Sequence, residues 1–317
     1  MTGATGFVGS ILCDLLAQAG YIVRAALRSD RSVPGCIAET VVIGDITATA
    51  DLAAALEGAD AVIHAAARTH VLHDSPANAD LYMQINARGT LRLAEAAAQA
   101  GVRRFVYLSS IKVNGEETNR AYTPDDEPCP RDAYGMSKWH GERFLQEVAA
   151  RTRMEAAIVR PPLVYGPGVG ANFLRLMRWV DGGWPLPLSS IRNRRSLVSV
   201  WNLCDLLLRV LTHPAASGRV WMVSDGDDLS TVELIRRLGK TMDRRVSLLP
   251  VPVGVLRAAA TLTGRTAEFD RLCGSLFVDI TRTRHDLHWM PPLPVAEGLA
   301  RTVGWYSLLR KLAPECS

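Results

Sequence analysis

The chain has 317 residues, 48% of them hydrophobic and 21% charged, which is the usual balance of a globular protein with a full core. A net charge of +4 is too small to indicate nucleic-acid binding, although it suits an anionic substrate or cofactor. No segment approaches the roughly 20 apolar residues of a membrane helix, the six cysteines form no CxxC pair, and the N-terminus lacks the features of a signal peptide, so we expect a cytoplasmic protein without membrane insertion.

In chain order, the first half alternates short apolar runs with Ala- and Leu-rich stretches of helical periodicity. This alternation is typical of βαβ units, in which helices cross over between parallel strands. It predicts strands at residues 22–26, 39–43, 61–65, 104–108 and 156–159. It predicts helices at residues 9–19, 50–56, 83–100 and 134–151, with a loop at 123–130. The expected fold class is a doubly wound parallel α/β sheet of the Rossmann type.

In the second half this alternation ends, and glycine, proline and scattered aromatic residues interrupt short helical stretches. We expect residues 1–160, with about 195–225, to form a dinucleotide-binding domain. Residues 161–194 and 226–317 are expected to form a smaller substrate-binding region. There, residues 251–262 are expected to be a core or cap helix, and the seven tryptophans to be mostly packing residues.

The chain opens on a glycine-rich turn that only Met1 precedes. In a doubly wound fold this turn follows the first strand, which lies in the centre of the sheet. We therefore expect that most of the first strand is missing from this chain. Its place beside residues 22–26 should show a gap or poorly paired strands.

That turn has the sequence TGATGFVG at residues 2–9, with glycines spaced as GxxGxxG ahead of a helix. Glycine allows a tight turn and a close approach to a pyrophosphate, whose charge then meets the N-terminus of the helix. A glycine-rich turn alone is a weak signal. The βαβ units that follow it favour a dinucleotide site.

Tyr134 and Lys138 stand four residues apart on a predicted helix, and residues at this spacing share one face. A nearby ammonium stabilises a phenolate, so we expect Lys138 to lower the pKa of Tyr134 from its usual value of about 10. The tyrosine could then donate or accept a proton at neutral pH. Ser109 and Ser110 follow the strand predicted at 104–108, at the sheet edge where ligands bind. Ser110 is the better candidate to bind the substrate oxygen.

Further motifs follow along the chain: GDI at 44–46, HAAA at 64–67, NARGT at 86–90, SSIKVNG at 109–115, YGMSK at 134–138, RPPLVYGPG at 160–168, RSLVSV at 195–200 and DLHW at 286–289. With these motifs in this order, the chain resembles an extended short-chain dehydrogenase/reductase of the NAD(P)-dependent epimerase/dehydratase family. Within that family it is most similar to bacterial O-antigen nucleotide-sugar 4-reductases, of the UDP-N-acetylquinovosamine dehydrogenase kind, and to UDP-glucose 4-epimerases.

The resemblance implies roles for the matching positions. The glycines of the turn would hold the pyrophosphate, Asp45 the adenine, and Lys138 the nicotinamide ribose. Asn172 and Arg195 would contact the diphosphate of a sugar nucleotide, for which a guanidinium is well suited. The basic neighbours of Arg195 either assist it or face solvent. The implied cofactor contacts are Gly3, Gly6, Phe7, Val8, Gly9, Asp45, Ile46, Ala65, Ala66 and Lys138.

Two departures from the family pattern refine these expectations. Members that use NAD carry an acidic residue at the end of strand two, whereas this chain has Leu27 followed by Arg28. An arginine without the carboxylate suits a 2′-phosphate, so NADP(H) is the preferred cofactor; the alternative is NAD(H), with Arg28 in solvent. Related sugar 4,6-dehydratases carry an Asp-Glu pair where this chain has Ile111 and Lys112. We therefore do not expect dehydration.

The histidines are not expected to take part in catalysis or metal binding. His64 ends a predicted strand, where a packed or backbone-bonded histidine is expected. His70 and His73 form no metal-ligand set with a carboxylate or cysteine, so no metal is predicted.

The favoured interpretation is an NADPH-dependent reductase acting at C4 of a UDP-linked 4-keto-6-deoxy-hexosamine, for surface polysaccharide synthesis. The nearest alternative is a UDP-hexose 4-epimerase such as UDP-glucose 4-epimerase, which would use Ser110, Tyr134 and Lys138 in both directions. A reductase of non-sugar ketones comes third. A cofactor-sensing protein without turnover is disfavoured because both Tyr134 and Lys138 are present. A homodimer is compatible with the sequence.

Overall fold

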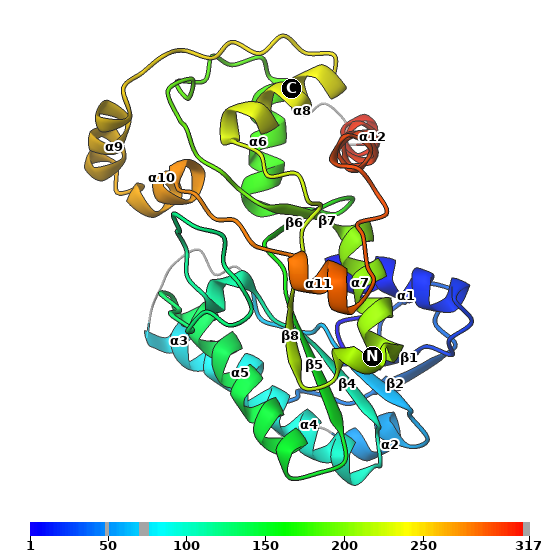
Figure 1. The fold of residues 1–317 in the computed structure, drawn as a ribbon. Coiled ribbons are helices and arrows are strands. Elements are labelled where there is room, and N and C mark those ends of the chain that lie inside the picture. The colour runs from blue at the N-terminus through cyan, green and yellow to red at the C-terminus, as the bar shows by residue number, and fades with distance from the viewer. Residues whose placement is uncertain (48–50, 70–75, 313–317) are drawn as a thin grey trace.

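Parallel strands form the centre of the lower half of the molecule in Figure 1, a computed structural model that describes residues 1–47, 51–69 and 76–312. In the main sheet Arg104 pairs with Ala61 on one side and with Glu155 on the other. The parallel α/β fold of the Rossmann type is confirmed. The main sheet has the strand order β3 (Ala61–His64), β4 (Arg104–Leu108), β5 (Glu155–Arg160) and β8 (Arg219–Met222), and β1 (Arg24–Leu27) pairs in parallel with β2 (Glu39–Val42) beside it.

Met1 and Thr2 connect these two groups of strands. The Ala26 N–H donates to Met1 O at 2.8 Å, and the Thr2 N–H donates to Ile63 O at 3.1 Å. In the described part of the chain, β1 and β3 share no ladder with each other. Thr2 instead forms parallel bridges to both Ala26 and His64, and the expectation that most of the first strand is missing stays a prediction.

Helices cover both faces of the sheet because successive strand residues point to opposite sides. On β4, Val106 packs into one apolar cluster, whereas its neighbours Phe105 and Tyr107 pack into another on the opposite face. The burial of these side chains, at about 25 cal/mol per Å², holds the layers together. The first cluster includes α1 (Phe7–Gln18) and α7 (Val200–Thr212), and the second includes α2 (Leu52–Leu56), α4 (Gly89–Gln99) and α5 (Ala133–Ala150).

The helix predicted at 83–100 is one part of a longer and irregular helical segment. It begins with α3 (Pro76–Tyr82) and passes through a π-helical turn, Met83–Arg88, before α4. In this turn the buried Asn86 donates to Ser137 Oγ on α5 at 3.0 Å. Such π-helical turns are frequent at functional sites. This one contacts α5 one turn after Tyr134, through Ser137.

A second layer of helices and short strands lies above the carboxyl ends of the sheet (Figure 1). In its core Tyr165 and Phe173 stack with their ring centroids 5.5 Å apart. Leu262 at its edge is 88% exposed, so the segment predicted at 251–262 is a cap helix. No helix in the described ranges is long and apolar enough to cross a membrane. The layer contains β6 (Leu163–Tyr165), β7 (Leu197–Ser199), α6 (Ala171–Asp181), α8 (Thr231–Thr241), α9 (Val253–Leu262), α10 (Thr266–Cys273) and α12 (Val295–Leu312).

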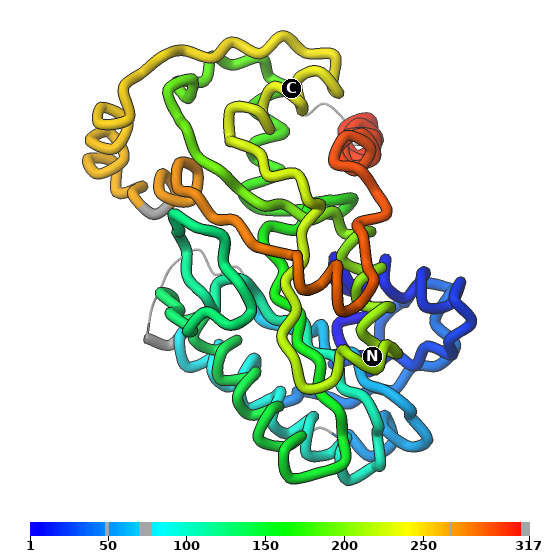
Figure 2. The backbone as a smooth tube through the Cα atoms, in the orientation of Figure 1, coloured from blue at the N-terminus to red at the C-terminus, as the bar shows by residue number. Residues whose placement is uncertain are grey.

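The segment between α10 and α11 (Thr281–Asp286) runs along the boundary between the two layers (Figure 2). Within it Leu276 forms a bridge to Arg195, and Val278 forms a bridge to Tyr122. One stretch of chain therefore ties the second layer to the loops above the sheet.

Candidate active site

A cavity of about 920 Å³ lies between the carboxyl ends of the parallel strands and the second layer. Ala65 follows β3 and Ser110 follows β4, so both line the cavity from the sheet. Open parallel sheets bind their ligands at this edge. The structure brings together from distant parts of the chain the predicted residues Gly3, Gly6, Phe7, Val8, Gly9, Ala65, Ser110, Tyr134, Lys138, Asn172 and Arg195.

The glycine turn packs too closely for side chains. Gly3 has a φ of +73°, and a Cβ atom there would lie 2.6 Å from Ala66 N. A Cβ atom on Gly9 would lie 1.9 Å from Gly3 O. These glycines allow α1 to begin directly against the end of β3. Ala66 lies behind the turn and outside the cavity lining.

The N-terminus of α1 opens into the cavity. Gly6 is its N-cap, and no side chain of the described residues caps it. Phe7 and Val8 in the first turn line the cavity. The N–H groups and the dipole at such a helix end attract negative charge. These residues therefore fit the pyrophosphate of a dinucleotide.

Three predicted cofactor residues lie outside the cavity lining, on the loops that follow β1 and β2. Arg28 is exposed. Hydrogen bonds to Asp45 from Thr47 N and Oγ1, at 2.9 and 2.8 Å, lower the pKa of this carboxyl, and the Arg28 cation adds to the effect. Ile46 packs against Gly89 at the start of α4. Cofactor contacts by these three residues stay predictions.

Tyr134 lies in the first turn of α5. Burial raises its pKa above the usual value of 10, and a hydrogen bond with Ser110 opposes this effect. The Tyr134 ring meets the Tyr82 ring edge-on, with centroids 5.9 Å apart. The expectation that Lys138 lowers the pKa of Tyr134 is wrong for this structure, because burial outweighs the other effects on the phenol.

The ammonium of Lys138 is bound to β4. Its Nζ donates to Leu108 O at 2.8 Å and lies 4.6 Å from the centre of the Tyr107 ring. The side chain is 2% exposed. Burial lowers the pKa of Lys138 from 10.5 to about 7, although the Glu142 carboxylate opposes this effect. An amine with this pKa can hold or release a proton near neutral pH.

A buried ion pair supports α5 from behind. Arg160 of β5 donates to Glu142 of α5 through Nε at 2.9 Å and Nη2 at 2.5 Å, and these side chains are 4% and 3% exposed. Ser109 donates to the same carboxylate. Ser109 therefore joins the strand end to the helix, whereas Ser110 is the serine that acts on the pKa of Tyr134. Binding of the substrate oxygen by Ser110 stays a prediction.

Arg195 is the member of its basic run that enters the cavity. Its Nη1 donates to Gly274 O at 2.9 Å. Burial lowers its pKa and Glu116 opposes this effect, but a guanidinium stays charged at neutral pH. Arg192 is exposed, and Arg194 forms an ion pair outside the cavity. Of this run, Arg195 is the residue that lines the cavity, and its contact with a diphosphate stays a prediction.

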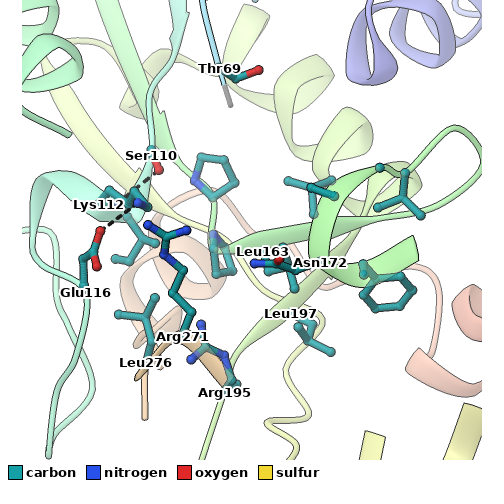
Figure 3. A pocket seen from close by; sticks show the side chains of 18 of the residues that line it. Thr69, Ser110, Lys112, Glu116, Leu163, Asn172, Arg195, Leu197, Arg271 and Leu276 are labelled. Carbon is teal, nitrogen blue, oxygen red and sulfur yellow. Dashed lines mark hydrogen bonds and ion pairs between the residues drawn. The ribbon is translucent and has the colours of Figure 1, made fainter. Parts of the chain in front are cut away.

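A cluster of charged side chains beside Ser110 was not assigned from the sequence (Figure 3). Lys112 Nζ lies 2.7 Å from Glu116 Oε1 and also pairs with Asp132, the N-cap of α5. All three residues line the cavity. Closeness in sequence to the predicted catalytic residues could have indicated them, because Lys112 is two residues after Ser110 and Asp132 is two residues before Tyr134.

Two further arginines line the cavity from the second layer. Arg175 of α6 donates to Asn172 Oδ1 at 2.8 Å. Figure 3 shows Arg271 of α10 beside Arg195, on the side of the pocket that holds the charged cluster. No sequence signal points to Arg271, because α10 is far along the chain from every motif of the site.

His64 is a buried structural residue, as predicted. Its Nε2 lies 3.0 Å from Thr90 Oγ1, which donates its own proton to a backbone carbonyl one turn earlier, so Nε2 carries the hydrogen. Nδ1 then accepts from Thr2 Oγ1 at 2.6 Å. Burial lowers the pKa of His64 to about 3. His70 and His73 lie outside the described residues, among which no group of His, Cys, Asp or Glu could hold a metal ion.

The fold and the cavity together are those of an NAD-dependent enzyme of the short-chain dehydrogenase/reductase type, with the glycine turn, Ser110, Tyr134 and Lys138 around one cavity. Residues 1–224 match the model described as the NAD dependent epimerase/dehydratase family. The chain belongs to this family and is an enzyme.

Known proteins resemble the chain over nearly its whole length. UDP-glucose 4-epimerase of Vibrio cholerae is 43% identical over 308 residues, which cover 95% of this chain and 93% of that one. The N-acetyl-alpha-D-glucosaminyl-diphospho-ditrans,octacis-undecaprenol 4-epimerase of Escherichia coli O157:H7 is 26% identical and covers 96% and 93%. The solved structure of MoeE5 with UDP-glucuronic acid and NAD has a TM-score of 0.78 at 25% identity and covers 97% and 98%.

Proposed function

We propose that this enzyme transfers a hydride at C4 of a sugar that carries a diphosphate at C1. The observation behind the proposal is that Ser110, Tyr134 and Lys138 line the same cavity as Arg195 and Asn172. The Vibrio cholerae and Escherichia coli relatives described above are 4-epimerases of diphosphate-linked sugars by name. A guanidinium suits the diphosphate because it offers two parallel donors to phosphate oxygens.

In this function Ser110 and Tyr134 bind the C4 oxygen of the sugar. The nicotinamide, when bound, supplies or accepts the hydride. Tyr134 keeps its proton at neutral pH because burial raises its pKa, which suits a residue that donates a proton to a C4 keto oxygen. Lys138 stands one helical turn away, and its pKa of about 7 allows it to hold or release the proton that Tyr134 exchanges.

Within this function we infer net reduction of a UDP-linked 4-keto-6-deoxy-hexosamine with NADP(H). Leu27 stands where members that use NAD carry a carboxylate. Arg28 follows it and is exposed, while Arg31 Nη1 lies 3.5 Å from Thr5 Oγ1 of the glycine turn. Two guanidinium groups at this edge suit a 2′-phosphate. A consumed NADPH fits net reduction.

The second candidate is 4-epimerisation of a UDP-hexose. It is favoured by the 43% identity to the Vibrio cholerae UDP-glucose 4-epimerase. The residues used would be the same, with the hydride returned to the opposite face of the C4 keto group. The two candidates differ in whether the cofactor is consumed.

One assay separates these candidates. Purified protein is incubated with NADPH and a UDP-4-keto-6-deoxy-hexosamine, and in parallel with NAD and UDP-glucose or UDP-N-acetylglucosamine. A reductase consumes NADPH in proportion to product, measured by nicotinamide absorbance. An epimerase leaves the absorbance unchanged while the sugar inverts at C4, seen by NMR. Turnover of non-sugar ketones alone would contradict the proposal.

A further inference from the structure

A second cavity of about 420 Å³ adjoins the first. Trp179 of α6 and Leu272 of α10 line both cavities, so the two spaces meet at these side chains. The rest of the lining comes from residues 184–188, whose sequence is WPLPL. We call this second cavity the apolar groove.

The apolar groove offers hydrocarbon surface and few hydrogen-bonding groups. Its described lining side chains are tryptophan, proline and leucine, without a carboxylate, amide or hydroxyl group. The backbone of Leu186 is already paired, because its N–H donates to Ser247 O at 2.9 Å and its carbonyl accepts from Leu249 N at 2.8 Å. A nucleobase needs polar groups that fix its orientation, whereas a hydrocarbon chain does not.

The mouth of the groove presents large apolar side chains to solvent. Trp184 is 69% exposed and Trp179 is 40% exposed. Leu249, whose backbone pairs with the groove segment, is also exposed. Contiguous exposed apolar groups of this kind mark binding surfaces. Here they continue outward from the cavity that holds the catalytic residues.

Positive charge stands where the two cavities meet. Arg271 directly precedes Leu272, and Arg271, Arg195 and Arg175 all line the first cavity. Glu268 pairs with Arg175 at 3.4 Å, so Arg195 and Arg271 carry most of the charge offered to a ligand. Side by side (Figure 3), they suit the two phosphates of a diphosphate.

We propose that the apolar groove holds the first isoprene units of a polyprenyl carrier, so that the enzyme also accepts its sugar on a lipid diphosphate. The groups that such a ligand requires line adjoining spaces, because Tyr134, Arg195 and Arg271 line the first cavity and Trp179 lines both. In this proposal Tyr134 contacts the sugar, Arg195 and Arg271 contact the diphosphate, and Trp179 and Trp184 contact the chain. This inference rests on the proposed function for the chemistry at C4 and names a carrier for the sugar.

Binding tests the groove without requiring turnover. Isothermal titration of the full chain compares farnesyl diphosphate, inorganic diphosphate and UDP. We expect farnesyl diphosphate to bind roughly tenfold or more tightly than inorganic diphosphate, because the groove buries its chain. Trp184→Ala should remove this advantage and change UDP affinity by less than about twofold. Trp139→Ala is the matched control, since Trp139 is half-buried on α5 and lines neither cavity.

Two results would overturn the inference. One is equal affinity for farnesyl diphosphate and inorganic diphosphate in the parent protein. The other is a loss of UDP affinity in Trp184→Ala as large as the loss of farnesyl diphosphate affinity, which would make the groove part of a nucleotide site.

Turnover separates this inference from the proposed function. The substrates are the farnesyl-diphospho and the UDP-linked forms of the same sugars, namely the 4-keto-6-deoxy-hexosamine with NADPH and N-acetylglucosamine with NAD. We expect Trp184→Ala to raise KM roughly tenfold for the lipid-linked sugar with kcat unchanged. Conversion of the UDP-sugar without binding of farnesyl diphosphate refutes the carrier and leaves the proposed function standing. Trp184-dependent binding of farnesyl diphosphate without conversion of either sugar supports the groove and refutes the chemistry at C4.

Discussion

Burial governs the protonation of both titratable residues in the proposed catalytic set. It raises the pKa of Tyr134 and lowers the pKa of Lys138, because a site of low polarity disfavours the charged form of either group. Near neutral pH the Tyr134 phenol is therefore protonated, and the Lys138 amine is close to the midpoint of its titration. Such a set exchanges protons with a substrate oxygen without placing two charges side by side.

Removal of the phenolic hydroxyl tests the proton donor. Tyr134→Phe should lower turnover roughly 10²- to 10⁴-fold, the usual share of general acid catalysis, and keep cofactor affinity. Steady-state kinetics and cofactor titration measure the two effects. Tyr122→Phe is the control, because it loses a hydroxyl that donates to Glu117 O outside the cavity lining. Near-normal turnover in Tyr134→Phe would end this mechanism.

The pKa of Lys138 predicts a pH dependence of stability. Its folded value of about 7 lies below the usual 10.5, so between these values the unfolded chain binds a proton that the folded chain does not. Stability then rises with pH across this window and falls as the pH is lowered toward 7. The Lys138→Met variant has no titratable group at this position. The free energy of unfolding of the parent minus that of Lys138→Met, from urea unfolding, should therefore increase from pH 7 to pH 9. A flat difference would contradict the burial effect.

The sequence predicts which residues line the site better than it predicts how their pKa values shift. Ser110 and Tyr134 were predicted from strand-end position and helix spacing, and both line the cavity. The predicted shift of the pKa of Tyr134 was in the wrong direction, because the burial of the phenol depends on distant chain segments that no local sequence pattern reveals. Arg271 was missed for the same reason.

At the scale of elements, the start of α1 depends on the absence of one methyl group. A Cβ atom on Gly9 would lie 1.9 Å from Gly3 O, so Gly9→Ala must displace the turn and the helix N-terminus. We expect a loss of cofactor affinity and a destabilisation of about 1 to 3 kcal/mol from overpacking. Titration with NADP(H) and urea unfolding measure these effects.

Gly254→Ala provides the matched control for this substitution. Gly254 also lies in a helix, but a Cβ atom there would meet nothing within 4 Å. Alanine is a better helix former than glycine by about 0.5 to 1 kcal/mol, so this variant should be as stable as the parent or slightly more stable. Equal effects of the two substitutions would show that close packing at Gly9 is not the cause.

Regular elements were more predictable than irregular ones. The strand expected at 104–108 is found at Arg104–Leu108, because its apolar run is bounded on both sides. Short strands of the second layer, such as Leu163–Tyr165, were missed because three residues show no periodicity. The π-helical turn at Met83–Arg88 has no signature in the helical pattern. The division into two domains stays a prediction.

At the scale of the whole molecule, ligands that bind only the folded chain should stabilise it. Such a ligand adds about 2.7 kcal/mol at a concentration of one hundred times its Kd. We expect NADP(H) to raise Tm more than NAD(H) at equal concentration, and Arg28→Ala to reduce the difference. Arg192→Ala is the control, because Arg192 is also exposed but belongs to the second layer, between α6 and β7. Equal shifts from the two cofactors in the parent protein would contradict the NADP(H) proposal.

The proposed catalytic set and the proposed substrate contacts come from different layers. Ser110, Tyr134 and Lys138 stand on β4 and α5, which Ser109 and Glu142 fasten together beneath them. Asn172 and Arg271 stand on α6 and α10 in the layer above. Mutations in the upper layer can therefore exchange one sugar or carrier for another while the reacting groups keep their spacing. Chemistry and recognition can evolve independently in such a protein, and a laboratory selection for new substrates should begin in α6 and α10.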